Sequence, residues 1–352
     1  MLAVENGYAN LNLNTLWFAL IAFLWIGFFF LEGFDFGVGM LLPFLSKDDT
    51  DRRVIINTIG PVWDGNEVWL IVAGGATFAA FPNWYATFFS GLYIPLFLIL
   101  AALIFRGVAF EFRGKDRRPA WRAWWDRALF WGSLFPSVLF GIAFANILRG
   151  VPIAANGEFT GSLLGLLNPY ALTGGLATFA LFTLHGAAFL ALKTEGEVRE
   201  RARAAGRGIG LLAAVVALVF FAWTLWSAAR VDDRVLVPGI IAVAAVLACV
   251  LAAWLLRQGR DGRAFIATGL STAFLMTTIF VSLYPRVMVS SLGPANDLTI
   301  WNSSSTPRTL GLMTIVAVIF TPVVLAYQGW TYWVFRKRLR REDIPAAGGA
   351  QH

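Results

Sequence analysis

The chain has 352 residues, of which 58% are hydrophobic and 14% are charged. Soluble domains carry about 25% charged residues, so this composition excludes an ordinary soluble enzyme and indicates a protein embedded in a lipid bilayer. The formal net charge of +7 would suit a nucleic-acid ligand. The basic residues, however, follow alternate loops between apolar segments, so we expect an anionic membrane surface beside them and no nucleic acid.

The amino-terminal segment does not have the pattern of a cleavable signal peptide. Residues 1–14 contain no Lys or Arg, so the positively charged region that opens such a signal is missing. We therefore expect the first apolar segment to remain as a membrane anchor. The single cysteine, Cys249, excludes a disulfide bond within the chain.

Nine apolar runs are long enough to cross a bilayer, which takes about 20 helical residues. They predict an all-α integral membrane protein with one transmembrane domain over its whole length. Pro95 and Pro136 fall inside two runs and are expected to kink their helices. Asn168 and Thr306 each precede a proline, which is the signal of a helix start. The predicted helices cover residues 15–43, 56–80, 84–112, 126–148, 169–192, 209–229, 235–256, 264–284 and 308–335.

The distribution of Lys and Arg predicts the orientation in the membrane. If the amino terminus lies outside, 23 of the 28 basic residues fall on the cytoplasmic side. Cytoplasmic loops of membrane proteins carry such an excess. We therefore predict nine spans, with the amino terminus outside and the carboxyl terminus in the cytoplasm.

Four acidic residues lie inside the first two apolar segments. Glu32 and Asp35 occur in LEGFDFGVG, and Asp64 and Glu67 occur in GPVWDGNEVWL. A carboxylate in hydrocarbon is costly, so an acid there indicates a functional site. Each pair has i, i+3 spacing and lies on one face of its helix. The short connection makes the two helices antiparallel neighbours, which would place Asp35 level with Asp64 and Glu32 level with Glu67.

Arg106 is the predicted counter-ion of these acids. It follows the apolar run LILAALIF, near the end of the third predicted helix and at nearly the same depth. One guanidinium cannot neutralise four carboxylates, so at least one or two acids should carry a proton at pH 7, and such a group can relay protons. Glu111 lies one turn nearer the cytoplasm, and Asp126 begins the fourth helix at the same surface.

A purely structural role for the acids is the competing interpretation. The acids would then cap broken helices or bond to neighbouring helices, whose close approach Gly33, Gly37 and Gly39 would allow. A single acid would favour that role, whereas four acids with Arg106 at matched depth favour proton or cation handling. Asp35 is the acid that we expect to be structural, because GFDFG has the sequence of a helix-breaking turn.

Residue types that usually carry redox or hydrolytic chemistry are scarce. Haem, iron and copper sites in bundles use His, Met or Cys from facing helices, and His185 is the only histidine within a predicted span. We expect a hydrogen-bonded core imidazole there. The sequence has no phosphate-binding GxxxxGK(S/T) motif and no zinc-ligand or Ser-His-Asp spacing. We therefore predict no metal site and no catalytic residue in this chain.

The segments that hold the acids also carry a family resemblance. The chain resembles subunit II of cytochrome bd-type quinol oxidases in LEGFDFGVGMLLPF, GPVWDGNEVWLIVAGGATFAAFPNWYATFFSGLYIP, FRGVAFEFR, WDRALFWGSLFPSVLFGIAFANILRGVP and LLNPYALTGGL. The similarity is strong over about the first 200 residues and continues in length and in the nine-span layout. The combination of WDGNEVWL with GFDFGVG is far more specific than a match in hydropathy.

This resemblance implies a terminal respiratory oxidase in the bacterial cell (inner) membrane, which oxidises quinol, reduces O2 to water and generates a proton motive force. In this family, haem b and haem d belong to the larger subunit I, and subunit II supports that partner and lines a route for cytoplasmic protons. By position, Glu32, Asp64 and Glu111 match the acids of this route. Asp35 and Asp126 match acids associated with assembly of the haem core.

By its spacing from Asp64, Glu67 joins the predicted proton path, with Arg106 as the counter-ion. Two departures qualify the resemblance. Glu32 and Glu111 stand where some relatives have Asp, so the carboxylate reaches further. The role of His185 stays open. So do the identity of the quinone, its binding within this chain, a small accessory membrane subunit, and membership of the cyanide-insensitive branch.

Two other classes of protein remain as alternatives. A free-standing proton-coupled transporter or cation channel would explain two helices that look broken near the middle of the membrane. Against this class, the second half of the chain has no matching pair of interrupted helices. A structural partner subunit with no role in proton transfer is the third class.

Overall fold

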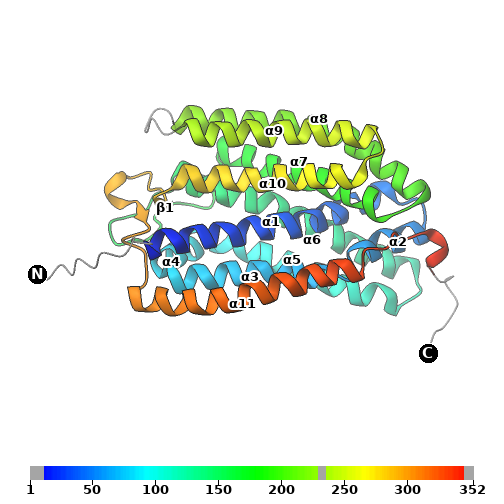
Figure 1. The fold of residues 1–352 in the computed structure, drawn as a ribbon, viewed down its shortest axis with the longest axis horizontal. Helices are drawn as coiled ribbons and strands as arrows, with labels where there is room; N and C mark the ends of the chain where they lie inside the picture. The colour runs from blue at the N-terminus through cyan, green and yellow to red at the C-terminus, as the bar shows by residue number, and fades with distance from the viewer. Residues whose placement is uncertain (1–11, 229–234, 345–352) are drawn as a thin grey trace, which may run out of the picture.

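The computed structural model describes residues 12–228 and 235–344. These residues form a bundle of long helices with a small two-stranded sheet at one end (Figure 1). The helices are α1 (Leu13–Leu45), α2 (Asp49–Ile59), α3 (Trp63–Ala80), α4 (Pro82–Gly91), α5 (Tyr93–Phe112), α6 (Pro119–Arg149), α7 (Pro169–Lys193), α8 (Gly196–Ala228), α9 (Leu236–Arg257), α10 (Asp261–Leu283) and α11 (Pro307–Val334). The antiparallel strands are β1 (Arg286–Met288) and β2 (Leu298–Thr299).

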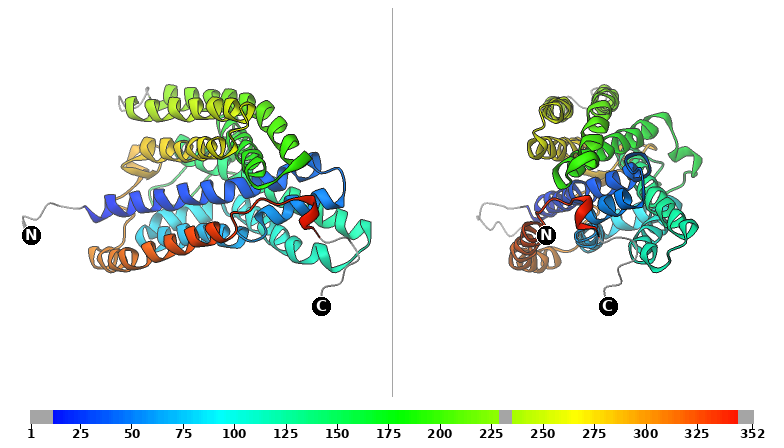
Figure 2. Two further views of the ribbon diagram at one scale, coloured as in Figure 1. Left: turned by 45° about the vertical axis from the view of Figure 1, so that its right-hand side comes forward. Right: turned by 90° about the vertical axis from the view of Figure 1, so that its right-hand side faces the viewer.

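The bundle extends from α8 and α9 at one edge to α11 at the opposite edge (Figure 1). α1 passes through the middle, and the end-on view of Figure 2 shows it enclosed by other helices. Every residue of α1 from Leu31 to Leu42 is buried. In α11, by contrast, Leu310 is the only buried residue. The acids of α1 are therefore held in the protein interior, whereas α11 presents most of its apolar surface outwards.

Glycine lets α1 and α7 cross with their backbones in contact. A Cβ atom on Gly37 would lie 1.9 Å from the backbone oxygen of Phe182, and one on Gly186 would lie 2.3 Å from the carbonyl carbon of Gly37. Small residues at such a crossing permit tight helix association in a membrane. The helix break predicted at GFDFG is therefore wrong, because α1 is continuous through these residues and uses its glycines for close approach.

Two predicted helices are each divided in the structure. The segment predicted at 56–80 contains the end of α2 and all of α3, because Pro61 cannot donate the hydrogen bond that would continue α2. The segment predicted at 84–112 divides at Leu92 into α4 and α5. Pro95 consequently lies in the first turn of α5, where proline is tolerated, and not in the middle of a span as predicted.

The predicted helix starts with an N-cap and proline are confirmed. The Asn168 side chain accepts a hydrogen bond from the backbone of Ala171 at 3.0 Å, and Thr306 accepts one from Thr309 at 3.3 Å. α6 begins earlier than predicted, at Pro119, and α8 begins at Gly196. The end predicted at residue 229 and the amino-terminal residues 1–11 lie outside the described part of the chain.

Eight helices among the described residues are long and apolar enough to cross a membrane. α3 is not among them, because Asp64, Asn66 and Glu67 make its first turns polar. The predicted all-α membrane fold is confirmed, while the count of nine spans and the orientation stay predictions. We call the end at which α1 stops and α6 starts the basic end, because it gathers Lys47 and Arg201 among others.

Candidate functional site: a buried charge cluster

Three helices bring ionisable side chains together in the interior, in what we call the buried cluster. α1 contributes Glu32 and Asp35, α3 contributes Glu67, and α5 contributes Arg106. Glu32, Asp35 and Arg106 have no exposed surface, and the Glu67 side chain is 21% exposed. The i, i+3 spacing on α1 places both of its acids on one face, as predicted.

Arg106 is the cation of this cluster. Its Nη1 atom lies 2.5 Å from Oε1 of Glu32 and 3.5 Å from Oε2 of Glu67. The rings of Phe36 and Phe110 lie 5.1 and 5.5 Å from the guanidinium carbon, a distance at which a cation is attracted to an aromatic face. The structure thus brings Arg106 next to both glutamates.

Hydrogen bonding inside the cluster is incomplete among the described residues. The three side-chain nitrogens of Arg106 and both carboxylate oxygens of Glu32 are buried without a hydrogen bond of good geometry, although the ion-pair distances are short. Buried polar atoms are normally satisfied by protein or by ordered water. The described residues therefore leave these atoms of Arg106 and Glu32 without a complete set of hydrogen-bond partners.

Asp35 is held by the side chain of Asn66, which was not among the predicted site residues. Asn66 donates from Nδ2 to Oδ2 of Asp35 at 2.7 Å, and its Oδ1 accepts from Gln328 at 2.9 Å and from Tyr332 at 2.7 Å. Asn66 lies between the two acids of WDGNEVWL. Gln328 and Tyr332 are polar residues at i, i+4 in an otherwise apolar segment. This spacing is the sequence feature that could have indicated their role.

Two residues of the predicted proton path lie outside the cluster. Asp64 and Glu111 are exposed, and neither makes an ion pair with another described residue. The structure brings Asp35 to Asn66 and not to Asp64. Asp64 nevertheless precedes Glu67 by one turn of α3 and is exposed at the protein surface.

Asp126 belongs to a network at the basic end. Arg113 donates to it from Nε at 2.6 Å and also contacts Asp49 at 2.7 Å, and Arg52 approaches Asp126 at 3.5 Å. These contacts tie the start of α6 to the end of α5 and to α2. The arrangement can fix the relative positions of three helices, which suits a structural acid.

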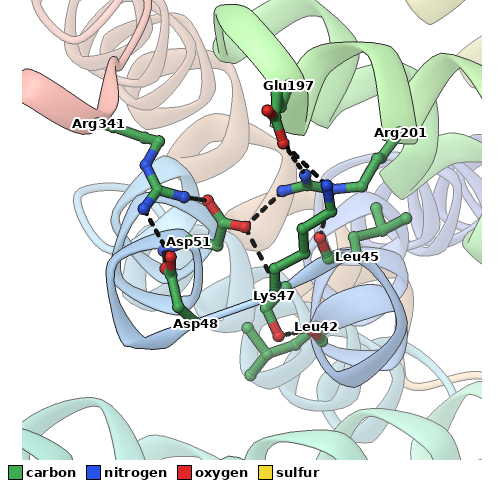
Figure 3. A network of polar contacts seen from close by, with 9 residues as sticks. Leu42, Leu45, Lys47, Asp48, Asp51, Glu197, Arg201 and Arg341 are labelled. Atoms are coloured by element: carbon green, nitrogen blue, oxygen red, sulfur yellow. Dashed lines mark hydrogen bonds and ion pairs between the residues drawn. The ribbon is translucent and has the colours of Figure 1, made fainter.

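A second network at the basic end is centred on Asp51, which is fully buried (Figure 3). Its carboxylate accepts hydrogen bonds from Arg201 at 2.5 Å, from the backbone of Lys47 at 3.0 Å and from the Arg341 guanidinium. We call these residues, together with Asp48 and Glu197, the Asp51 network. No pattern in the sequence predicted this network.

Asp48 joins α2 to the carboxyl-terminal part of the chain. It is the N-cap of α2, and its side chain accepts from the backbone of Asp51 at 2.9 Å. Arg341 donates to it at 2.6 Å, and this hydrogen bond lowers the pKa of the Asp48 carboxyl below its usual value.

Residues 336–343 run back across the basic end and form what we call the C-terminal strap. The backbone of Leu339 donates to Lys193 at 2.8 Å and accepts from Glu195 at 3.1 Å. Arg338 donates to the carbonyl of Leu192 at 3.0 Å. The strap is therefore bonded to the end of α7, although α11 itself is scarcely buried.

His185 has both ring nitrogens engaged. Nδ1 lies 2.7 Å from the hydroxyl of Thr268, and Nε2 lies 3.0 Å from the carbonyl oxygen of Phe30. Its ring stacks on Phe265 at a centroid distance of 4.8 Å. In the described part of the chain, no group of three or more His, Cys, Asp or Glu side chains is arranged to hold a metal ion.

The fold and the buried cluster define a polytopic α-helical membrane protein with ionisable groups in its interior. Residues 13–335 match the family model of cytochrome bd terminal oxidase subunit II. The chain belongs to this family, so it is a multi-pass protein of the bacterial inner membrane and a subunit of a haem-containing oxidoreductase complex.

Individual relatives agree with this assignment. Cytochrome bd ubiquinol oxidase subunit 2 of Bacillus subtilis is 45% identical, over 94% of this chain and 98% of the relative. Cytochrome bd-I ubiquinol oxidase subunit 2 of Escherichia coli is 37% identical, over 94% and 96%. The structure of bd oxidase from Geobacillus thermodenitrificans superposes with a TM-score of 0.73 over 92% of this chain and 99% of that chain. At 22% identity, the last comparison shows the fold alone.

Proposed function

We propose that this chain supports the haem-bearing subunit I and lines a route by which cytoplasmic protons reach the site of O2 reduction. Quinol is then the electron donor and O2 the acceptor of the whole complex. The observation that carries the proposal is the buried cluster, because an acid held inside a membrane protein indicates a path for protons or ions.

The exposure of the acids forms a graded series. Asp64 is exposed, the Glu67 side chain is 21% exposed, and Glu32 is fully buried against Arg106. A proton that arrives from the basic end would meet these residues in that order, with Glu111 as an outer acid. Arg106 would keep the charge of the interior acids balanced as they change protonation state.

In this proposal, Asp35 and Asp126 have structural roles. Both accept short hydrogen bonds, from Asn66 and from Arg113 respectively. Such bonds hold a carboxylate in one orientation and suit acids that maintain the shape of the subunit on which the haem-bearing partner assembles.

The outward surface of α3, α5 and α11 carries exposed apolar side chains, which supports the presence of a partner subunit beside it. Ile71 of α3 is 72% exposed, Phe105 of α5 is 56% exposed and Val318 of α11 is 69% exposed. Apolar side chains of this kind need lipid or protein beside them. We assign part of this surface to subunit I, which would also cover the exposed side of Asp64.

Haem b and haem d belong to subunit I in this proposal. A haem iron takes axial ligands such as His, Met or Cys. His185 is already bonded through both ring nitrogens, and Cys249 is buried against Ser271 at 3.0 Å. The described side chains therefore fit a supporting subunit better than a haem-binding one.

The transporter alternative is weakened by the fold. It drew support from breaks in both of the first two spans, but α1 is continuous and only the connection from α2 to α3 is broken. A transporter would also be complete without a haem-bearing partner.

The test begins with purification of the tagged chain from native membranes. A second large membrane protein with haem b and haem d absorption supports the oxidase proposal, and a colourless chain that is stable alone contradicts it. In the purified complex, Asp64→Asn should slow O2 reduction and leave the haem spectrum intact. Asp116→Asn is the matched control, because Asp116 is outside the helices and pairs with Arg118. Normal turnover of a spectrally intact Asp64→Asn complex would contradict the proton path.

A further inference from the structure

Asn66 uses its complete hydrogen-bonding capacity in the interior. Its Nδ2 donates to Asp35 at 2.7 Å and approaches the carbonyl oxygen of Leu31 at 3.4 Å. Its Oδ1 accepts from Gln328 and Tyr332. A side-chain amide offers two donors and two acceptor positions, and all four face a partner here. A fully buried amide with four partners is held in one orientation.

The partners decide which way the amide faces. The carbonyl of Leu31 can only accept, and the Asp35 carboxyl presents an acceptor oxygen, so the NH2 group must point towards α1. The carbonyl oxygen then points towards α11, where Tyr332 and Gln328 both donate to it. A reversed amide would set its oxygen against the oxygens of α1, which is unfavourable.

α11 thereby reaches the buried cluster from the margin of the bundle. Its other polar anchor is remote. Trp17 donates at 3.0 Å to the Leu310 carbonyl and to the Thr314 hydroxyl, which lie about six and five helical turns from Tyr332. Only Leu310 is buried along α11. Gln328 and Tyr332 are therefore the polar contacts through which the position of α11 bears on Asp35.

We propose that Asn66 is a positioning residue for Asp35, and that Gln328 and Tyr332 of α11 lock the Asn66 amide in the orientation that holds Asp35. The inference rests on the proposed function, in which Asp35 has a role in assembly of the haem core. It adds that this role depends on α11, whose outward surface is open to a partner subunit. Loss of the α11 donors frees the amide to rotate and releases Asp35.

The experiment compares variants of the purified oxidase complex. Asn66→Leu keeps the shape and removes the amide, and Tyr332→Phe removes one donor. Tyr327→Phe is the matched control, because it removes the same hydroxyl group from the same helix at a residue that is 64% exposed. We expect Asn66→Leu to reproduce most of the loss of haem that Asp35→Asn causes, Tyr332→Phe to give a smaller loss, and Tyr327→Phe to give none.

A double variant separates positioning from general packing. In the Asp35→Asn background, Asn66→Leu should cause no further loss of haem, because the side chain that it positions is already neutralised. An equal loss with and without Asp35 would overturn the proposal. So would equal behaviour of Tyr332→Phe and Tyr327→Phe, which remains measurable if Asn66→Leu does not assemble.

Infrared difference spectra distinguish this inference from the proposed function. The carboxyl band of Asp35 is identified as the band that Asp35→Asn removes. Its frequency should shift in Asn66→Leu and in Tyr332→Phe. A shifted band with full haem content in every variant would support the positioning and contradict the assembly role of Asp35. An unshifted band would overturn the positioning whatever the haem content.

Discussion

The buried cluster and the Asp51 network each contain fully buried acids, Glu32 and Asp35 in the first and Asp51 in the second, but their charge balance differs. In the cluster, Glu32, Asp35 and Glu67 share one cation, Arg106. In the Asp51 network, the acids Asp48, Asp51 and Glu197 face three cations, Lys47, Arg201 and Arg341.

The difference follows from where each site lies. At the basic end, helix ends and the C-terminal strap can each deliver a long basic side chain. In the middle of the bundle, only the faces of neighbouring helices are available, and each added charge must be desolvated. The end therefore holds neutralised acids with fixed partners, whereas the interior holds a surplus of acids. Burial is common to both regions, so the proton path proposed above is supported by the deficit of cations in the cluster and not by burial alone.

The largest expected effect is loss of the single cation of the cluster. Arg106→Leu leaves Glu32 and Glu67 without a counter-charge, and removal of one partner from a buried pair costs about 3–5 kcal/mol of folding free energy. We expect little or no assembled complex, measured as the yield of haem absorption per membrane protein. Arg106→Lys should retain part of the yield, and a normal yield from Arg106→Leu would contradict the counter-ion role.

The comparison is sharpened by the same substitution in both regions. Glu67→Gln removes a proton-accepting group from the cluster, and we expect turnover to fall by about a hundredfold, the lower range for loss of a proton-transfer group. Glu197→Gln changes an exposed acid of the Asp51 network, which pairs with Lys47 at 3.0 Å, and should leave turnover unchanged. Oxygen consumption per haem is the measurement, and equal rates in the two variants would remove the functional distinction.

Asp51→Asn should lower the stability of the complex and leave its turnover normal, in contrast to Glu67→Gln. The substitution weakens the hydrogen bonds from Arg201 and Arg341, and we expect it to cost about 2 kcal/mol of stability. Turnover at low temperature should stay normal, because this acid is not on the proposed path. A thermal unfolding curve measures the stability, and oxygen consumption measures the turnover. A complex with slowed turnover and a normal unfolding curve would contradict the prediction.

The smallest effect concerns pH. Arg341 lowers the pKa of the Asp48 carboxyl in the folded protein, so this contact stabilises the folded state above the unfolded pKa of about 3.9 and is lost as pH falls through the folded value. The difference in melting temperature between the native protein and Asp48→Asn should be constant from about pH 7 to 5 and should shrink below about pH 4. A difference that grows on acidification would contradict the assigned contact.

The sequence predicted the charged members of the cluster because acids and arginine stand out in apolar runs. It did not predict Asn66, Gln328 or Tyr332, because uncharged polar residues are ordinary in membrane helices and 262 residues separate Gln328 from Asn66. The helix break at GFDFG was wrongly predicted because the sequence does not show that Gly37 lies against Gly186.

The Asp51 network was not predicted for a different reason. Charged residues near helix ends look like a solvated surface, and nothing local to Asp51 indicates that it is buried. Its burial depends on Arg201 from α8 and on Arg341 from the C-terminal strap. Such long-range partners carry no periodic signal in the sequence, whereas the i, i+3 spacing of Glu32 and Asp35 does.

The C-terminal strap also has a consequence for biogenesis. Arg341 leaves the ribosome 290 residues after Asp51, so the basic end is incomplete while the preceding helices are being inserted. Until then Asp51 has Arg201 as its guanidinium partner and lacks the second. A nascent chain that stops before the strap would leave this acid half-neutralised at the membrane surface. The charge balance at the first turn of α2 is therefore completed only after α11 has been synthesised.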